Sequence, residues 1–409
     1  MRFNTRLLHG ESAARNAHGE TLPPVSQVSA FRYDSMEELE QVFQHKRMGF
    51  AYTRIGNPTV SALERKIAEL EGGAGAVSCS SGMAAITAAI LAICRNGDEI
   101  IAGSGLYGGT IDLLHDLEKL GIHTVFLKRL GGEELKNAIS SRTKLVFGEM
   151  ISNPAQQVLD VPEVSGIAHE AGLPLFVDST TATPYIVRPL QLGADAVIHS
   201  ASKYLNGGGN AIGGIIVDGG KFRWDPGKHK ALSDFAKYGK SAFMVRLRTD
   251  IWENMGGCIS PANAFLCYIG SETLGLRMER ICSNAERLAG ALDALPGIEV
   301  NYLKLPQHPY HAYVEKELNG YGGGILNFRA GSREKAFRII NSLKYAAIAS
   351  NIGDIRTLVI HPASTLYLHT EAAEREAAGV YEDTVRVSVG IEDAEDMIDD
   401  FTEAVKSAG

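Results

Sequence analysis

Short apolar segments alternate with helical segments from about residue 62 to residue 220, and this alternation constrains the fold of the 409-residue chain most strongly. Strands that alternate with helices form a mostly parallel sheet with helices on both faces. The expected strands are Ala76–Ser80, Glu99–Ala102, His123–Leu127, Leu145–Glu149, Leu175–Asp178, Ala196–His199 and Gly214–Val217. We therefore expect an α/β fold whose ligands bind beyond the carboxyl ends of the strands.

Two further regions flank this α/β domain, which we expect over residues 61–255. Residues 1–60 lack a regular apolar period and are interpreted as an extended arm that contacts a neighbouring subunit, with a short helix near Met36–Gln44. Residues 256–409 begin with a long helix, straight or bent, at Ala262–Leu295 and predict a smaller α+β domain. Its other expected elements are Ile298–Leu303, Gly324–Phe328, Glu334–Leu343, Leu358–Ile360 and Ala394–Lys406.

Charge, apolar runs and cysteine content argue against nucleic-acid binding, membrane insertion and secretion. The net charge of −8 argues against a dominant nucleic-acid surface. The longest apolar run, Met83–Cys94, is shorter than the roughly 20 residues that span a bilayer, and Met1–Arg6 lacks the apolar region of a secretory signal. Five cysteines without a Cys-x-x-Cys pair suit a reducing compartment. We expect a cytoplasmic protein without nucleic-acid or membrane partners.

Lys203 and Asp178 both come at or just after an expected apolar strand, so both are predicted to lie at the carboxyl edge of the sheet. Alone, each has an ordinary explanation as a solvated lysine or a helix-capping aspartate. Together they match the needs of pyridoxal 5′-phosphate, because a lysine forms its Schiff base and an acid keeps its ring nitrogen protonated. Ser200 and Ser202 flank the lysine and can donate hydrogen bonds to a phosphate.

The segment Ser80–Ala84 runs from an expected strand through small residues into an Ala-rich helix. Backbone N–H groups at a helix N-terminus bind anions, so this turn and the serines beside Lys203 predict a phosphate cradle. A tight strand-to-helix turn without a ligand is the ordinary alternative. Tyr107 follows the next expected strand, where its ring could stack on a cofactor or simply be a core or surface tyrosine.

Gly103–Gly108 matches the G-x-G-x-x-G pattern of dinucleotide-binding folds. The next expected strand ends in Leu127, Lys128 and Arg129, without the acid that binds a ribose, and the motif follows the second expected strand rather than the first. Nicotinamide or flavin binding is therefore not expected. The twelve histidines are scattered, and no metal site is expected.

Taken together, these segments resemble the Cys/Met-metabolism family of pyridoxal-phosphate enzymes over nearly the whole chain. The motifs that carry the resemblance are Tyr52–Thr59, Leu70–Gly73, Ser81–Ala85, Tyr107–Thr110, Val177–Thr180, His199–Tyr204, His361–Ser364 and Arg386–Glu392. The resemblance implies the type I fold of pyridoxal-phosphate transferases.

The same resemblance implies roles for the matching residues. Lys203 would bind the cofactor and move protons, Asp178 would pair with the ring nitrogen, and Tyr107 would stack on the ring and act in proton transfer. The other residues would bind anionic groups: Gly82, Met83, Ser200 and Ser202 the phosphate, Tyr52 and Arg54 the phosphate of a neighbouring subunit, and Arg386, Asn153 and Ser350 the substrate α-carboxylate. Ser202 stands where the family usually has Thr, and both residues offer a hydroxyl.

Within the family, three stretches are similar to O-acetylhomoserine sulfhydrylases: Asn351–Asp354 with Thr357–Thr365, Gly214–Phe222, and Ser260–Leu266. Methionine γ-lyases typically have Cys where Gly109 stands, and the lyases tend to have Leu in place of Asn351. The chain departs from the sulfhydrylase pattern at Leu366 and is shorter near residues 225–245. We expect γ-replacement, in which O-acetyl-L-homoserine and sulfide or a thiol give homocysteine or methionine and acetate.

Other functions remain open at this point. γ-Elimination, as in methionine γ-lyase and cystathionine γ-lyase, and the cystathionine γ-synthase reaction would use the same residues. A non-catalytic binding protein is a third class, against which intact Lys203, Asp178 and Arg386 argue. The resemblance also implies a homotetramer of two catalytic dimers that acts on a small amino-acid substrate. It leaves open whether sulfur arrives as free sulfide or on a sulfur-carrier protein.

Overall fold

The computed structural model describes residues 1–10, 19–44, 46–368 and 370–409. Its larger sheet has the strand order β1-β7-β6-β5-β4-β2-β3, and β7 runs opposite to the other strands. The strands are β1 (Gly75–Cys79), β2 (Glu99–Gly103), β3 (His123–Leu127), β4 (Thr143–Glu149), β5 (Leu175–Asp178), β6 (Ala196–His199) and β7 (Gly214–Asp218). The expected α/β fold with a mostly parallel sheet is confirmed.

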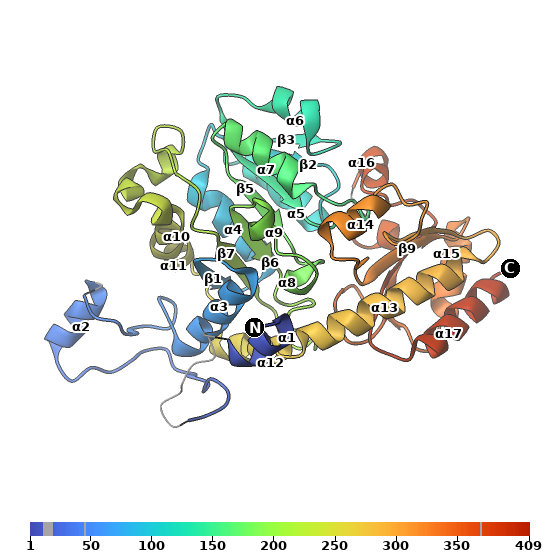
Figure 1. The fold of residues 1–409 in the computed structure, drawn as a ribbon, viewed down its shortest axis with the longest axis horizontal. Coiled ribbons are helices and arrows are strands. Elements are labelled where there is room, and N and C mark those ends of the chain that lie inside the picture. The colour runs from blue at the N-terminus through green and yellow to red at the C-terminus, as the bar shows by residue number, and fades with distance from the viewer. Residues whose placement is uncertain (11–18, 45, 369) are drawn as a thin grey trace.

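Helices cover both faces of this sheet because both faces are apolar (Figure 1). Along β4, Leu145 and Phe147 join one apolar cluster and Val146 joins the other, as the alternation of side chains in a strand requires. One cluster includes α3 (Pro58–Glu71), α6 (Gly132–Ala138), α7 (Val161–Glu170), α8 (Thr183–Ile186) and α9 (Pro189–Leu192). The other includes α4 (Gly82–Ile93), α5 (Gly108–Glu118) and α10 (Ala242–Arg246).

A second, smaller sheet follows in the chain, with strand order β10-β11-β12-β9-β8. Its strands are β8 (Glu299–Asn301), β9 (Ile325–Arg329), β10 (Ala347–Ile348), β11 (Leu358–Ile360) and β12 (Thr384–Ser388). It packs on α13 (Leu274–Asp293), α15 (Arg333–Ser342) and α17 (Ala394–Ser407), while α14 (His311–Glu317) and α16 (Ala372–Ala377) complete this part. The boundary near residue 255 stays a prediction.

The prediction of one long helix at Ala262–Leu295 is wrong. The structure has α12 (Pro261–Ser271) and α13, separated by Glu272 and Thr273. Arg277 stabilises the break, because its Nη2 donates to Gly270 O at 2.7 Å and its Nη1 donates to Tyr204 O at 2.6 Å. In the described part of the chain, no helix is long and apolar enough to cross a membrane.

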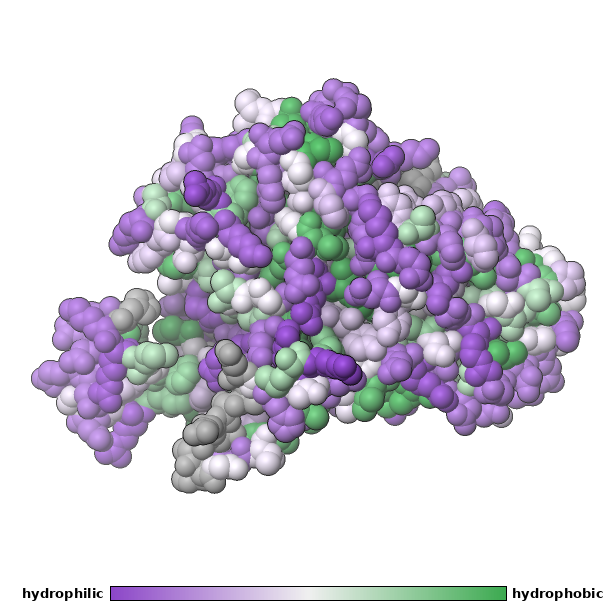
Figure 2. Space-filling view, in the orientation of Figure 1, coloured by the Kyte–Doolittle hydropathy of each residue, from purple (hydrophilic) through white to green (hydrophobic). Residues whose placement is uncertain are grey.

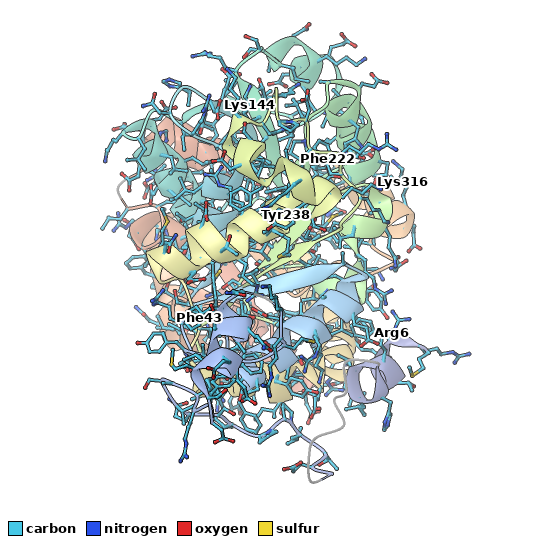
Figure 3. All side chains as sticks on the ribbon, turned by 90° about the vertical axis from the view of Figure 1, so that its left-hand side faces the viewer. Arg6, Phe43, Lys144, Phe222, Tyr238 and Lys316 are labelled. Carbon is cyan, nitrogen blue, oxygen red and sulfur yellow. The ribbon has the colours of Figure 1, made fainter. Side chains whose placement is uncertain are left out.

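The N-terminal region is only partly the extended arm that we expected. It begins with α1 (Phe3–His9), which buries Leu7 and packs on α3 and α13. The part that projects from the body carries α2 (Met36–Phe43), as Figure 1 shows. Figure 3 shows the molecule from the side of this arm, with Phe43 labelled. Several apolar side chains of this projecting arm are exposed: Val25, Val28, Met36, Phe43, Met48 and Tyr52. In Figure 2, apolar surface is visible where the arm meets the body.

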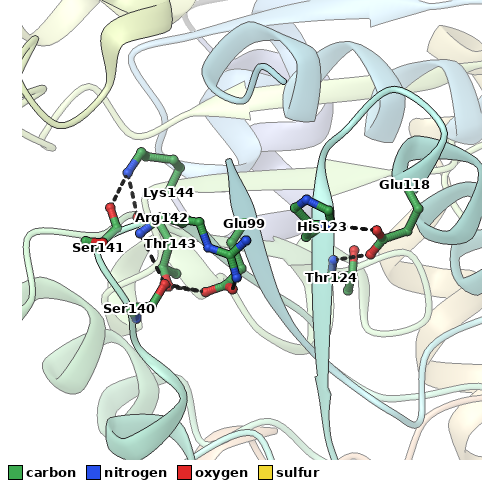
Figure 4. A network of polar contacts seen from close by, with 9 residues as sticks. All are labelled: Glu99, Glu118, His123, Thr124, Ser140, Ser141, Arg142, Thr143 and Lys144. Carbon is green, nitrogen blue, oxygen red and sulfur yellow. Dashed lines mark hydrogen bonds and ion pairs between the residues drawn. The ribbon is translucent and has the colours of Figure 1, made fainter. Parts of the chain in front are cut away.

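Polar side chains form a network at the edge of the larger sheet where the parallel strands begin (Figure 4). Glu99, which begins β2, accepts hydrogen bonds from Ser140 and Thr143 at 2.8 and 2.7 Å and pairs with Arg142 at 3.1 Å. The buried Lys144 donates to Ser141 O at 2.8 Å. Glu99 and Arg142 thus pair with each other, and Lys144 binds backbone carbonyls. The candidate site lies at the other edge of the sheet, where the parallel strands end.

Candidate active site

A cavity of about 780 Å³ opens where the carboxyl ends of β4, β5 and β6 meet the N-terminus of α4. Ligand pockets commonly have volumes of about 300–1,000 Å³. The predicted site residues that line it are Gly82, Met83, Tyr107, Asn153, Asp178, Ser200, Ser202, Lys203, Ser350 and Arg386. Tyr52 and Arg54 are not among its lining residues. The cavity therefore gathers residues that lie up to 305 positions apart in the chain, from Ser81 to Arg386.

Lys203 lies in the turn after β6 and projects its amine into this cavity. Its Nζ donates a hydrogen bond to Asn351 Oδ1 at 2.5 Å. Burial lowers the pKa of the Lys203 amine, and the positive charge of Arg386 lowers it further. The amine therefore reaches its neutral, nucleophilic form at a lower pH than an exposed lysine does.

The N-terminus of α4 forms an anion cradle beside Ser200. The Ser81 side chain caps this 12-residue helix by accepting a hydrogen bond from Ala84 N at 3.1 Å. A Cβ at Gly82 would lie 2.7 Å from Ser200 Cβ, so glycine is required for this close approach. The helix N-terminus and the Ser200 hydroxyl thus share one wall of the cavity.

Ser202 takes part in the local structure of the same wall. Its hydroxyl donates to Gly213 O at 3.1 Å and accepts from Gly213 N at 3.0 Å. These bonds tie the lysine-bearing turn to the segment before β7. The hydroxyl still lines the cavity, but its proton is already committed to a backbone carbonyl.

Two acids lie side by side at the sheet edge, since Asp178 ends β5 opposite Glu149 on β4. Asp178 accepts a hydrogen bond from Thr180 N at 2.9 Å, and Glu149 accepts one from Tyr107 N at 2.6 Å. Burial raises the pKa of Asp178, and burial together with the charge of Asp178 raises the pKa of Glu149 well above its usual range. In the described residues Asp178 forms no ion pair with a basic side chain, so a cation in the cavity would stabilise its charge.

Arg386 on β12 is buried and projects into the cavity. Its guanidinium donates to Asn351 O at 3.1 Å and to Asn153 Oδ1 at 3.4 Å. Burial lowers its pKa to about 10, and among the described residues it has no carboxylate partner. A buried arginine without an anion is suited to bind the carboxylate of a ligand by a bidentate contact.

Tyr52 and Arg54 lie at the base of the projecting arm. Arg54 Nη1 donates to Glu253 O at 2.8 Å, and its guanidinium lies 5.5 Å from the centre of the Tyr52 ring. The Tyr52 side chain is 43% exposed. Within one chain these two residues do not contribute to the cavity that holds Lys203.

Several polar residues of the cavity were not predicted as site residues, and three of them contact residues that were or lie beside them: Glu149, Thr180 and Asn351. Glu149 had a usable signal, since it ends an expected strand beside the strand of Asp178. Thr180 accepts a hydrogen bond from Ser200 N at 2.7 Å through its hydroxyl. Asn351 was noted only for its place in a motif, and its contacts with Lys203 and Arg386 depend on the packing of the two sheets.

The groups of the cavity fit pyridoxal 5′-phosphate. The cofactor needs a primary amine for its aldehyde, an anion site for its phosphate and an acid for its ring nitrogen. Lys203, the Gly82–Ser200 cradle and Asp178 supply these three groups on the walls of one cavity.

Gly353 provides a structural test of how the Lys203 turn is positioned. It has φ +72°, and a Cβ there would lie 2.5 Å from Tyr204 N and 2.9 Å from Lys203 C. We expect Gly353→Ala to lower cofactor occupancy and the thermal midpoint clearly more than Gly97→Ala. Gly97 has φ +89° and nothing within 4 Å, so it shares only the backbone cost of about 1–3 kcal/mol. Cofactor absorbance and thermal unfolding measure both effects, and equal losses in the two variants would contradict the proposed close approach.

The chain is similar to known proteins over nearly its whole length. The chain is 40% identical to an O-acetyl-L-homoserine sulfhydrylase of Corynebacterium glutamicum, over 98% of this chain and 95% of that protein. It is 37% identical to an L-methionine γ-lyase of Treponema denticola, over 98% of this chain and 96% of that protein.

A solved structure shows the same similarity. It is assigned as an O-acetylhomoserine (thiol)-lyase from Campylobacter jejuni, contains a pyridoxyl-lysine monophosphate, and superposes with a TM-score of 0.94 at 31% identity, covering 99% of this chain and all of that chain. The family model of Cys/Met metabolism PLP-dependent enzymes matches residues 4–406. The chain therefore belongs to the Cys/Met metabolism family of pyridoxal-phosphate-dependent enzymes.

Proposed function

We propose that the protein catalyses γ-replacement, in which sulfide or a thiol displaces acetate from O-acetyl-L-homoserine to give L-homocysteine or, from methanethiol, methionine. The observation that carries the proposal is the cavity in which the Lys203 amine, Asp178 and an Arg386 without an acidic partner meet. The similarity to the Corynebacterium glutamicum sulfhydrylase supports this choice of substrate.

Some residues of the cavity would bind the cofactor, and Lys203 would transfer protons. Bound pyridoxal 5′-phosphate supplies an electron sink that stabilises the negative charge left by loss of the α-proton. Asp178 would hold the ring nitrogen protonated, the Gly82–Ser200 cradle and Met83 would bind the phosphate, and Tyr107 would stack on the ring. Ser202 would join the cradle by turning its hydroxyl proton from Gly213 O to the phosphate. The Lys203 amine, held at 2.5 Å from Asn351, removes and returns protons of the substrate.

Arg386 orients the substrate in this scheme. Its guanidinium binds the α-carboxylate, with Asn153 and Ser350 on the same wall of the cavity. Asn153 and Asn351 accept hydrogen bonds from Arg386, so its guanidinium is already oriented before the substrate binds. A positioned carboxylate places the α-proton within reach of Lys203 and excludes other orientations.

γ-Elimination is the second candidate, because the Treponema denticola relative is named a methionine γ-lyase. The same residues would remove the leaving group, and water rather than a thiol would complete the reaction. Gly109, where methionine γ-lyases typically have Cys, favours replacement.

A paired assay on the cofactor-loaded protein separates the two candidates. One sample receives O-acetyl-L-homoserine with sulfide, the other receives L-methionine alone, and homocysteine and 2-oxobutanoate are quantified in both. Homocysteine from the first sample with little keto acid from the second is the expected result. Rapid keto acid from methionine would contradict γ-replacement, and the absence of both products would point to another ester or to a sulfur-carrier protein as donor.

Asp178→Asn tests the acid of the site. We expect kcat to fall roughly 100-fold or more while some cofactor remains bound, because the ring nitrogen loses the charge that keeps it protonated. Asp218→Asn is the matched control, since Asp218 is even more buried than Asp178 but lies at the other edge of the sheet, where it accepts a hydrogen bond from Gly220 N at 3.0 Å. Steady-state kinetics and cofactor absorbance measure the effect, and an unchanged kcat in Asp178→Asn would exclude the role.

We further propose a cytoplasmic homotetramer of two catalytic dimers, in which Tyr52 and Arg54 reach the phosphate in a neighbouring subunit. Two observations support this assembly: Tyr52 and Arg54 do not line the Lys203 cavity of their own chain, and apolar side chains of the arm are exposed. The five free cysteines suit a reducing cytoplasm.

Complementation between subunits tests the shared site. Tyr52→Phe and Lys203→Ala homo-oligomers should each be weakly active or inactive, and mixed oligomers should regain activity because some sites receive both intact residues. The measurement is specific activity after the two variants are unfolded together and refolded, with each variant refolded alone as control. A mixture no more active than the average of its parts would contradict sharing.

A further inference from the structure

Two cysteines lie directly opposite each other beside the phosphate cradle. Cys79 ends β1 and forms an isolated antiparallel bridge with Cys258, in the segment before α12. Both are free thiols and pack in the same apolar cluster. Directly opposite residues of an antiparallel pair project to the same side of the sheet, so the two cysteine side chains are neighbours.

The hydrogen bonds define which kind of pair this is. Ser80 N donates to Gly257 O at 2.8 Å, so the bond joins the residues on either side of the two cysteines rather than the cysteines themselves. Cys79 and Cys258 are therefore a non-hydrogen-bonded pair, for which the Cα separation is about 4.5 Å. That separation lies within the range of about 4.4–6.8 Å that a disulfide requires.

The two thiols differ in exposure. Cys79 is fully buried, and burial raises the pKa of its thiol, whereas Cys258 is partly exposed. A reagent from solution therefore meets Cys258 first. Cys94, Cys267 and Cys282 are all buried, and none of them is paired across strands with another cysteine in the described residues.

We propose that Cys79 and Cys258 are a reversible oxidation site, which closes to an intrachain disulfide when the protein meets a low-molecular-weight disulfide, RSSR. The Cys258 sulfur attacks RSSR, forms a mixed disulfide and releases one RSH. The Cys79 sulfur then attacks the Cys258 sulfur and releases the second RSH. The two thiols lose two electrons, RSSR gains them, and the two thiol protons pass to the two RSH products.

The bond would join two walls of the cofactor cavity. β1 continues through Ser80 into Ser81 and Gly82, and the Cys258 segment continues into α12, whose Asn263 also lines the cavity. A disulfide between them limits how far these walls can separate and restrains the unfolded chain. The oxidised protein should therefore unfold at a higher temperature and release its cofactor more slowly than the reduced protein.

Peptide mapping tests the site directly. The cofactor-loaded protein is incubated with glutathione disulfide, its remaining thiols are alkylated, and it is digested without reductant for mass spectrometry. We expect a linked pair of peptides that contains Cys79 and Cys258 and disappears after treatment with dithiothreitol. Glutathione retained on Cys258 without that link, or a Cys258 disulfide between two chains, would overturn the proposal.

Cysteine variants test whether the disulfide restrains the cofactor cavity. Oxidation should raise the thermal midpoint by several degrees and slow cofactor loss at least twofold in the wild type and in Cys94→Ser, but not in Cys79→Ser or Cys258→Ser. Cys258→Ser replaces a partly exposed residue and keeps the test valid if Cys79→Ser does not fold. An oxidised wild type that matches the reduced protein in both measurements would contradict the restraint on the cavity.

Discussion

Replacing Lys203 by alanine should abolish turnover, with kcat lower by on the order of 1,000-fold or more. The variant loses the amine that binds the cofactor covalently and moves protons at the substrate. The turn at position 203 should keep its conformation, because two hydrogen bonds between Ser202 and Gly213 also hold it. Thermal unfolding should therefore show a folded protein without the visible absorbance of lysine-bound cofactor.

Lys144→Ala is the matched control for this variant. Lys203 is partly buried and Lys144 is buried, but Lys144 lies at the opposite edge of the sheet and donates to Ser141 O at 2.8 Å, as Figure 4 shows. Its loss should reduce stability while cofactor absorbance and kcat remain. Turnover near the wild-type level in Lys203→Ala, or equal losses in the two variants, would contradict the role of Lys203.

Arg386→Met should lower kcat/KM by about 100- to 1,000-fold, mainly through a higher KM. Removing one partner of a buried ion pair costs about 3–5 kcal/mol, and here the partner left behind is the carboxylate of the substrate. Methionine keeps much of the length and apolar volume of the side chain. Arg248→Met removes a partly buried guanidinium that pairs with Glu64 at 2.7 Å outside the cavity, and it should leave KM unchanged.

The same variant has a pH signature that a purely structural role would lack. The charge of Arg386 lowers the pKa of Lys203, so its removal should raise that pKa. The neutral amine would then appear at higher pH, and the uptake of pyridoxal phosphate by the cofactor-free protein should shift its pH dependence in the alkaline direction. An unshifted profile together with an unchanged KM would exclude Arg386 from the site.

The central sheet was largely predictable from the sequence because its strands are short apolar runs bounded by turn residues. β3, β5 and β6 have the expected bounds, β1 is shifted by one residue toward the N-terminus, and β2 and β7 each extend one residue further at the C-terminal end. The predictions failed where tertiary contacts decide the structure. The break between α12 and α13 depends on Arg277 reaching the carbonyl of Gly270, and α1 forms because Leu7 finds a site against α3 and α13.

The candidate site was predictable where a residue follows a strand, as Lys203 and Asp178 do, because parallel strands end at one edge of the sheet. Arg386 and Asn153 came from the family resemblance, since their approach depends on how the two sheets pack. The contact of Asn351 with Lys203 was not visible in the sequence for the same reason. The proposed part of Tyr52 and Arg54 depends on a second subunit, which neither strand pattern nor spacing describes.

The most direct test of the account is to find the lysine that carries the cofactor. Borohydride reduction of the cofactor-loaded protein fixes pyridoxal phosphate to the lysine that holds it, and peptide mass spectrometry then locates the added mass. We expect the label on the peptide of Lys203, at stoichiometric occupancy. A label on another lysine, such as the buried Lys144, or a protein without any label would contradict it.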